Sequence, residues 1–306
     1  MTKAKIDRIF KDLFLVTLVP PIEGFDDFIG VWIKKGTPSY LIDVGPTSSA
    51  DQLENALKTL DVNLPDFIFL THIHLDHAGG IGHISDLFPK TPVICHKSAI
   101  PHLEDPAKLW EGSLKTLGER AKAYGPVKPV LKSLLVDAET FSSKEVIPII
   151  TPGHAPHHVS FITKQCLFAG ETCGVHLRFS SNKEYRRPAT PPRFFLETSL
   201  KSLDLLIEKE PEKICFGHFG IEGNAVKYLL EHKDQLVLWK DIIKDEMKNV
   251  ENKSFSDGCL NRLLKEDPKM AFFDLLDEGK KEREKGFIIN SIKGFQGYLE
   301  QISDNP

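Results

Sequence analysis

The chain has 306 residues, of which 41% are hydrophobic and 27% are charged, so it is long enough for one large α/β domain with an additional segment. This composition excludes the disordered and the membrane-embedded classes of protein. The formal net charge of -4 argues against a nucleic-acid-binding protein, because such proteins usually carry a basic face.

The N-terminal segment lacks the features of a signal peptide. Lys11 and Asp12 interrupt its apolar stretch, and no small-residue cleavage site follows. The run LFLVTLV is too short to cross a bilayer, and no longer apolar run occurs downstream. The five cysteines are odd in number and lack framework spacing, so we expect reduced thiols, a cytoplasmic location and no membrane partner.

Short β-rich runs bounded by Gly, Pro or Asp predict strands. In chain order these are residues 13–19, 28–35, 39–45, 66–72, 91–97, 145–154, 158–164, 166–171 and 212–218. Residues 49–61, with Ser49 as a helix cap, and residues 195–210 have apolar positions at helical spacing. Alternation of strands and helices indicates a sheet-based, layered α/β fold.

Two segments differ from this pattern. Residues 98–133 have a helical middle and prolines near both ends, which is typical of a helical insertion covering one edge of a sheet. After about residue 222 the strand runs stop, and residues 225–250 and 272–302 predict amphipathic helices. We therefore expect a catalytic domain over residues 1–222 and a C-terminal helical extension over residues 223–306.

The sequence THIHLDHAGG, residues 71–80, follows the apolar run FIFL and contains the densest group of metal-ligand side chains. Side chains alternate in an extended segment, so His72 and His74 point to the same side and could bind one metal ion. Asp76 and His77 lie past the turn, where they could serve a second ion. Any single histidine is more often a surface or core residue, but four ligand types within six residues favour a metal centre.

More ligand-type residues occur at later strand ends. His154 follows an apolar strand and a Pro-Gly turn, and Glu171 and His218 each end a strand after glycine. This repeated arrangement predicts that they gather at one edge of the sheets.

These motifs resemble those of the metallo-β-lactamase fold superfamily. THIHLDHAGG matches its His-x-His-x-Asp-His signature, TPGHAPHH resembles its second histidine motif, AGET stands where the family usually has Gly-Asp, and FGH resembles its last histidine motif. The resemblance covers about residues 10–220. It implies an αββα four-layer sandwich with a two-metal site, most similar to those of glyoxalase II and lactonases.

The resemblance also implies a role for each ligand. The first metal ion would be bound by three histidines and the second by an aspartate and two histidines: His72, His74 and His154, then Asp76, His77 and His218. Glu171 stands in place of the bridging aspartate and is one methylene longer. The expected cofactors are two divalent ions, zinc first, with iron or manganese as the alternatives.

Other residues near these motifs have less specific patterns. Cys173 lies where some relatives use a cysteine ligand, but we interpret it as a small buried residue. For His157 and His158 we expect hydrogen bonding around the site or packing, not metal ligation. The basic loop 176–193 could bind an anionic substrate, although surface exposure or intramolecular ion pairing is the commoner role of such arginines.

The expected activity is metal-dependent hydrolysis of a small molecule, in which a metal-bridging hydroxide, oriented by Asp76 as the catalytic residue, attacks an ester, thioester, lactone or phosphodiester. The alternative is an oxidoreductase of the persulfide dioxygenase type, with one iron bound by His72, His154 and Glu171. A non-catalytic binding protein is a third hypothesis, which the intact histidines disfavour. The C-terminal helices either cover the active-site edge or form a homodimer contact.

Overall fold

The structure is a computed structural model that describes residues 3–164, 166–248 and 255–304. The chain forms two compact units, each with its own internal packing. The first consists of residues 1–150 and 157–164, and the second of residues 151–156 and 165–306. Whether residue 222 is a functional domain boundary stays a prediction.

The first unit is built on a seven-stranded sheet in which the strands follow one another in chain order. These strands are β1 (Lys5–Arg8), β2 (Leu13–Leu18), β3 (Ile29–Lys34), β4 (Tyr40–Ile42), β5 (Phe67–Phe69), β6 (Val93–Cys95) and β7 (Leu135–Asp137). The pairs from β1 to β4 are antiparallel and those from β4 to β7 are parallel. Because β4 and β5 are parallel, their carboxyl ends lie at the same edge of the sheet.

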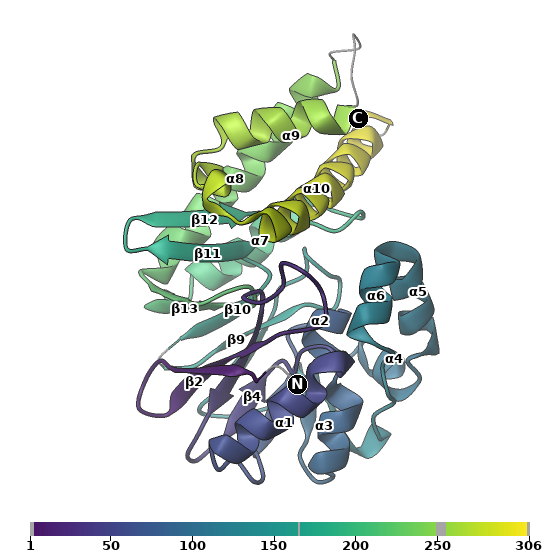
Figure 1. The fold of residues 1–306 in the computed structure, drawn as a ribbon, viewed down its shortest axis with the longest axis vertical. Helices are drawn as coiled ribbons and strands as arrows, with labels where there is room; N and C mark the ends of the chain where they lie inside the picture. The colour runs from purple at the N-terminus through teal and green to yellow at the C-terminus, as the bar shows by residue number, and fades with distance from the viewer. Residues whose placement is uncertain (1–2, 165, 249–254, 305–306) are drawn as a thin grey trace. The chain divides into compact units, whose positions relative to one another are not determined.

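Helices connect these strands (Figure 1). They are α1 (Ala50–Thr59), α2 (Leu75–Ala78), α3 (Ile81–Leu87), α4 (Ile100–Glu104), α5 (Ala107–Leu117) and α6 (Glu119–Tyr124). The 3₁₀ turns η1 (Thr47–Ser49) and η2 (Lys132–Leu134) accompany them. The predicted insertion is thus helical, and its α6 packs against α2 and η1. The unit ends with the antiparallel pair β8 (Ile147–Ile150) and β9 (Val159–Ile162).

The second unit combines short strands with long helices. Strand β10 (Leu167–Gly170) is parallel to β13 (Lys213–Phe216), which is antiparallel to β14 (Ile221–Gly223). Strands β11 (Val175–Ser180) and β12 (Lys183–Arg187) form a separate hairpin. The helical elements are α7 (Leu196–Ile207), α8 (Ala225–Glu246), α9 (Phe255–Glu266), η3 (Pro268–Met270), η4 (Phe273–Leu275) and α10 (Glu278–Asp304).

Helices α8, α9 and α10 pack against one another and bury an apolar core (Figure 1). Trp239 of α8 is fully buried, and its ring centroid lies 6.2 Å from that of Phe295 in α10. The indole N–H of Trp239 donates to Asp267, as does the side-chain amide of Gln235, at 2.7 Å each. These bonds attach the short η3 segment to α8.

Buried ion pairs connect the β11–β12 hairpin to these helices. Arg186 of β12 pairs with Glu231 of α8, and Arg187 pairs with Glu284 of α10. Glu284 also accepts from the Nε of Arg283 at 2.8 Å. All three residues of this last cluster are almost completely buried, so the pairing compensates charges that water does not reach.

The nine predicted strands and the helices predicted at 49–61, 195–210 and 225–250 are confirmed, although residues 249 and 250 lie outside the described residues. Two details are wrong. Ser49 occupies the N-cap of α1 but makes no capping hydrogen bond, and residues 273–275 form a 3₁₀ turn before α10 begins at Glu278.

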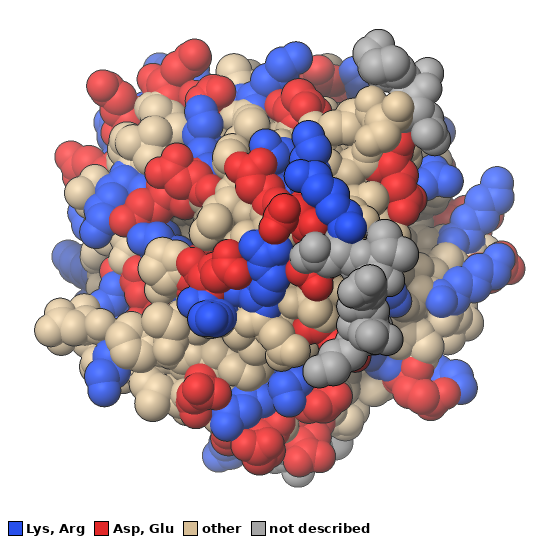
Figure 2. Space-filling view, turned by 90° about the horizontal axis from the view of Figure 1, so that it is seen from above, with Lys and Arg blue, Asp and Glu red and all other residues tan. Residues whose placement is uncertain are grey.

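Surface charge is mixed. Figure 2 shows one face on which lysine and arginine are interspersed with aspartate and glutamate. Within the described ranges, no helix is both long enough and apolar enough to span a bilayer.

Candidate metal centre

The signature histidines lie just past the end of β5. His72 and His74 follow the strand in an irregular segment, and His74 is the N-cap of α2, which carries Asp76 and His77. The ring centroids of His72 and His74 are 4.6 Å apart, with the ring planes at 86°. The ring of His77 lies 4.1 Å from that of His72. The expected proximity of these imidazoles is therefore present.

Close backbone contact fixes the start of α2 against the end of β4. The carbonyl of His77 accepts from the N–H groups of Val44 and Gly45, at 2.8 and 3.0 Å. A Cβ on Gly79 would lie 2.4 Å from the carbonyl oxygen of Leu75 and 3.1 Å from the Cα of Pro46. Only glycine allows this approach at position 79, the first residue of the Gly-Gly pair after the motif.

Asp43 is a residue of the candidate site that the sequence reasoning missed. It follows β4 directly, is 3% exposed and has a positive φ of 60°. One of its carboxylate oxygens lies 2.8 Å from Nδ1 of His77, and the other accepts from the N–H of Thr71 at 2.8 Å. Because a carboxylate only accepts, Nδ1 of His77 carries the proton, and Nε2 carries the lone pair that a metal ion requires.

The Asp43 carboxylate is also connected to His72, through hydrogen bonds of the Thr71 hydroxyl. The Thr71 hydroxyl lies 2.8 Å from Oδ2 of Asp43, to which it donates, and 3.0 Å from Nδ1 of His72. Since its hydrogen points to Asp43, the hydroxyl accepts from Nδ1 of His72. His72 therefore has the same tautomer as His77, with the lone pair on Nε2.

The second unit positions the other three candidate ligands. Glu171 and His218 follow the ends of β10 and β13, which are parallel neighbours. Oε2 of Glu171 lies 2.8 Å from Nε2 of His154, and Oε1 lies 3.6 Å from Nε2 of His218. The two oxygens of Glu171 thus face two different histidines.

The orientation of His154 is fixed by the loop after β12. Its Nδ1 lies 2.6 Å from the carbonyl oxygen of Ala189, which can only accept, so Nδ1 carries a proton. In the neutral ring, Nε2 then presents a lone pair to a carboxylate oxygen. A protonated ring would donate from Nε2 to Glu171, and a metal ion bound by both side chains would be the alternative partner of this lone pair.

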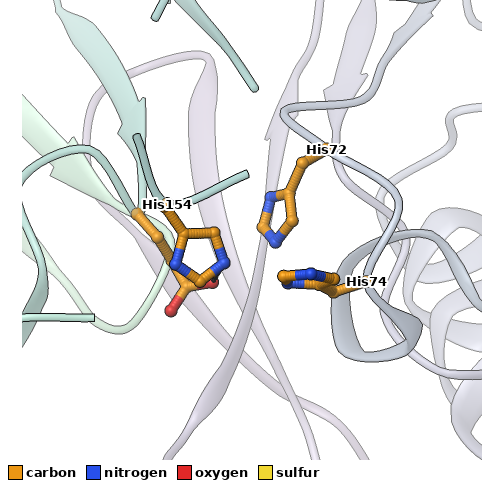
Figure 3. Close-up of side chains that lie close together, drawn as sticks. His72, His74 and His154 are labelled. Carbon is orange, nitrogen blue, oxygen red and sulfur yellow. Dashed lines mark ion pairs between the residues drawn. The ribbon is translucent and has the colours of Figure 1, made fainter. Parts of the chain in front are cut away.

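The candidate ligands form two groups among the described residues: His72, His74, His154 and Glu171 in the first, and Asp76, His77 and His218 in the second. Figure 3 shows the three histidines of the first group. Imidazole and carboxylate are the ligand types that zinc and other divalent transition metals take in proteins. All seven predicted residues belong to these groups, so the donor chemistry fits a metal centre.

Cys173 belongs to neither group. Its thiol donates to the carbonyl oxygen of Tyr228 at 3.5 Å, and burial raises its pKa to about 12. The structure thus agrees with its interpretation as a small buried residue. His157 and His158 also lie outside both groups, although each ring is within 6.3 Å of that of His72.

Most arginines of the basic loop pair with glutamates of the same chain. Arg186 and Arg187 are buried and paired with glutamates, and Arg178 pairs with Glu222. Intramolecular pairing, the commoner role of such residues, is the one observed for these three. Arg193 is exposed.

Comparison with known proteins identifies the family. The sequence model of the metallo-beta-lactamase superfamily matches residues 31–218. The metallo-beta-lactamase fold-containing protein ST1585 of Sulfurisphaera tokodaii is 28% identical over 232 residues, which cover 72% of this chain and 83% of the relative. The probable metallo-hydrolase YybB of Bacillus subtilis is 27% identical over 218 residues, covering 69% of this chain and 87% of the relative.

Comparison with solved structures gives the same family of folds. The archaeal metallo-beta-lactamase superfamily protein ST1585 from Sulfolobus tokodaii superposes with a TM-score of 0.69 and 24% identity, covering 94% of this chain and 99% of that one. The family protein TTHA1429 from Thermus thermophilus gives a TM-score of 0.63 at 20% identity, covering 97% and 95%. The chain belongs to the metallo-beta-lactamase superfamily, and the expected fold, with its C-terminal helical extension, is confirmed.

Proposed function

We propose that the protein is a hydrolase that uses two divalent metal ions, zinc in the first instance. The geometry of Glu171 is the observation that carries this proposal. One of its oxygens faces His154 of the first ligand group and the other faces His218 of the second. A carboxylate in this position is suited to bridge two ions, and the extra methylene of glutamate does not prevent it from facing both histidines.

The chain's own residues then have distinct roles. Two bound ions would supply a water of lowered pKa and would polarise the scissile bond. Asp76 would accept a hydrogen bond from the attacking water and so orient it. Asp43 holds His77 directly, and His72 through Thr71, in the tautomer that presents Nε2. Asp43 is thus a positioning residue of the centre.

The substrate class within this proposal is a small molecule with an ester, thioester, lactone or phosphodiester bond. One relative supports hydrolysis by its name, the probable metallo-hydrolase YybB. Glyoxylase B2 of Dictyostelium discoideum is also similar, with 31% identity over 129 residues, or 41% of each chain. The paired state of Arg178, Arg186 and Arg187 leaves only Arg193 of the basic loop's arginines for an anionic group of the substrate.

A second candidate function is oxygen chemistry at a single iron. It is favoured by one observation, that His72, His154 and Glu171 all belong to the first ligand group. The first group holds three histidines and one carboxylate, so it can supply the two histidines and one carboxylate typical of non-haem iron oxygenases; the second group, Asp76, His77 and His218, has that same combination.

The metal content of the purified protein separates the two functions. We expect about two zinc ions per chain by mass spectrometry after purification without added metal or chelator, together with hydrolysis of at least one bond class in a substrate panel. His74→Ala should lose metal and activity, whereas His83→Ala, which changes an exposed histidine of α3, should retain both. One iron per chain with little zinc would exclude the two-metal proposal and favour the second candidate.

Partners and location are further parts of the proposal. The partner we propose is a small-molecule substrate and not a nucleic acid, and the face in Figure 2 carries interspersed charges of both signs. Reduced cysteines agree with a cytoplasmic location, and all five are free thiols. A homodimer through the C-terminal helices is tested by light scattering of the full chain.

A further inference from the structure

His157 is a half-buried histidine beside the signature motif. Its ring centroid lies 6.3 Å from that of His72, with the two planes within 14° of parallel. It lies 6.0 Å from the ring of His74, at 82°. Two candidate ligands of the first group therefore lie next to this imidazole.

The backbone around His157 is fixed relative to the motif. The N–H of Val159, two residues further on, donates to the carbonyl of Thr71 at 2.7 Å, and Thr71 immediately precedes His72. This bond attaches the start of β9 to the segment that carries the histidines. His157 itself lies in the turn before β9, two residues from this hydrogen bond.

The two neighbouring histidines differ in burial. His158 is 0% exposed and its ring lies 5.3 Å from that of His72, so it packs against that ligand from the interior. His157 is half-buried, so part of this residue remains accessible to solvent beside the motif.

His157 is also not one of the ligands. Neither of the two ligand groups found among the described residues includes it. It is nevertheless close enough to His72 and His74 to contact a molecule held by ions at those residues. A neutral imidazole carries one N–H, and Nδ1 of His157 is buried, so the donor to the bound molecule would be Nε2, in the tautomer that carries the proton there or in the imidazolium.

We propose that His157 is a substrate-contacting residue that donates a hydrogen bond to an oxygen of the tetrahedral oxyanion formed during hydrolysis. This inference rests on the proposed function, and it adds a specific hydrogen-bond donor that stabilises the developing charge. Such a donor contributes chiefly in the transition state, where the oxygen is negatively charged.

Inorganic phosphate serves as a stable tetrahedral probe. We would compare the zinc-loaded wild type with His157→Phe, which keeps a flat ring but removes the donors, and His157→Gln, which keeps an N–H. His83→Phe, at the exposed histidine of α3, is the matched control. The measurements are metal content per chain, thermal midpoint, phosphate Kd by calorimetry, and kcat and kcat/KM for any substrate that the wild type hydrolyses.

With metal content unchanged, His157→Phe should raise the phosphate Kd about tenfold and lower kcat and kcat/KM about 100-fold. His157→Gln should recover part of both losses, and His83→Phe should match the wild type. Loss of metal in His157→Phe would overturn the proposal, because the residue would then support the ligands instead of the substrate. Phosphate affinity that is unmeasurable in the wild type, or equal in wild type and His157→Phe, would also overturn it.

Failure of the hydrolase proposal gives a different result. A wild type that hydrolyses nothing in the panel, while His157→Phe weakens phosphate binding and His157→Gln restores it, would reject hydrolysis and retain His157 as an oxyanion contact. If the wild type hydrolyses a substrate and His157→Phe binds phosphate as tightly as the wild type, hydrolysis is retained and the role of His157 is rejected.

Discussion

Replacement of Asp43 by asparagine tests the chain of hydrogen bonds that orients the candidate ligands. Asparagine is nearly isosteric, and its oxygen can still accept from the N–H of Thr71. Its amide group, however, would donate toward Nδ1 of His77, where the carboxylate accepted at 2.8 Å. His77 would then have to move its proton to Nε2, and that nitrogen could no longer bind a metal ion.

The expected loss of zinc affinity follows from this change in the tautomer of His77. Substitution of a carboxylate behind a metal-binding histidine costs about 10- to 100-fold in metal affinity, or about 1.4 to 2.7 kcal/mol. We therefore expect Asp43→Asn to bind zinc about 10- to 100-fold more weakly, measured by competition with a chelator of known affinity. We expect the far-ultraviolet circular dichroism spectrum to remain that of the wild type.

Asp66 provides the control. Its carboxylate accepts from the N–H and the hydroxyl of Ser39, at 2.7 and 3.0 Å, and these two bonds involve no histidine. Asp66→Asn makes the same change of carboxylate to amide in the same unit and should leave zinc affinity unchanged. Equal zinc affinity in Asp43→Asn and the wild type, or an equal loss in both variants, would refute the tautomer argument.

Three further predictions concern the second unit. Cys173→Ala should leave the metal content per chain unchanged, since the thiol donates to a backbone carbonyl; a lower metal content would show that it is a ligand. Glu284→Gln should lower the free energy of unfolding by about 3 to 5 kcal/mol in urea titrations, because Arg187 and Arg283 would remain buried with reduced compensation. Burial lowers the pKa of His232 from 6.5 to about 3, so the unfolded state binds more protons below pH 6.5. The contribution of this group to stability should therefore fall by about 1.4 kcal/mol per pH unit as the pH falls through that window, and His232→Gln should remove this slope.

The central strands and the ligand residues could be predicted because each is encoded locally. Apolar runs that end in glycine and a ligand-type residue identified β10 with Glu171 and β13 with His218 without any knowledge of distant contacts. A similar apolar run was present at β4, where Asp43 follows YLI directly, without the glycine. A lone aspartate after a strand is also a common turn residue, and only its contacts with Thr71 and His77 show its role.

The β11–β12 hairpin could not be predicted for a related reason. Its sequence is rich in charged residues, which normally indicate a surface loop. The charges are compensated by glutamates far along the chain, such as Glu231 for Arg186 and Glu284 for Arg187, which are 45 and 97 residues away. No local pattern contains such a pairing. The distance in sequence also explains why the arginines could not be assigned to substrate or to structure in advance.

The burial of Arg186 and Arg187 against the C-terminal helices limits how the chain can be shortened. The β11–β12 hairpin begins only a few residues after Glu171, and its last two arginines face glutamates of α8 and α10. A protein that ends at residue 222 would expose two cations and an apolar surface next to the turn that carries Glu171. Shortened chains, diagnostic fragments and domain grafts should therefore retain α8 to α10, because these helices are part of the folding unit that contains this candidate ligand.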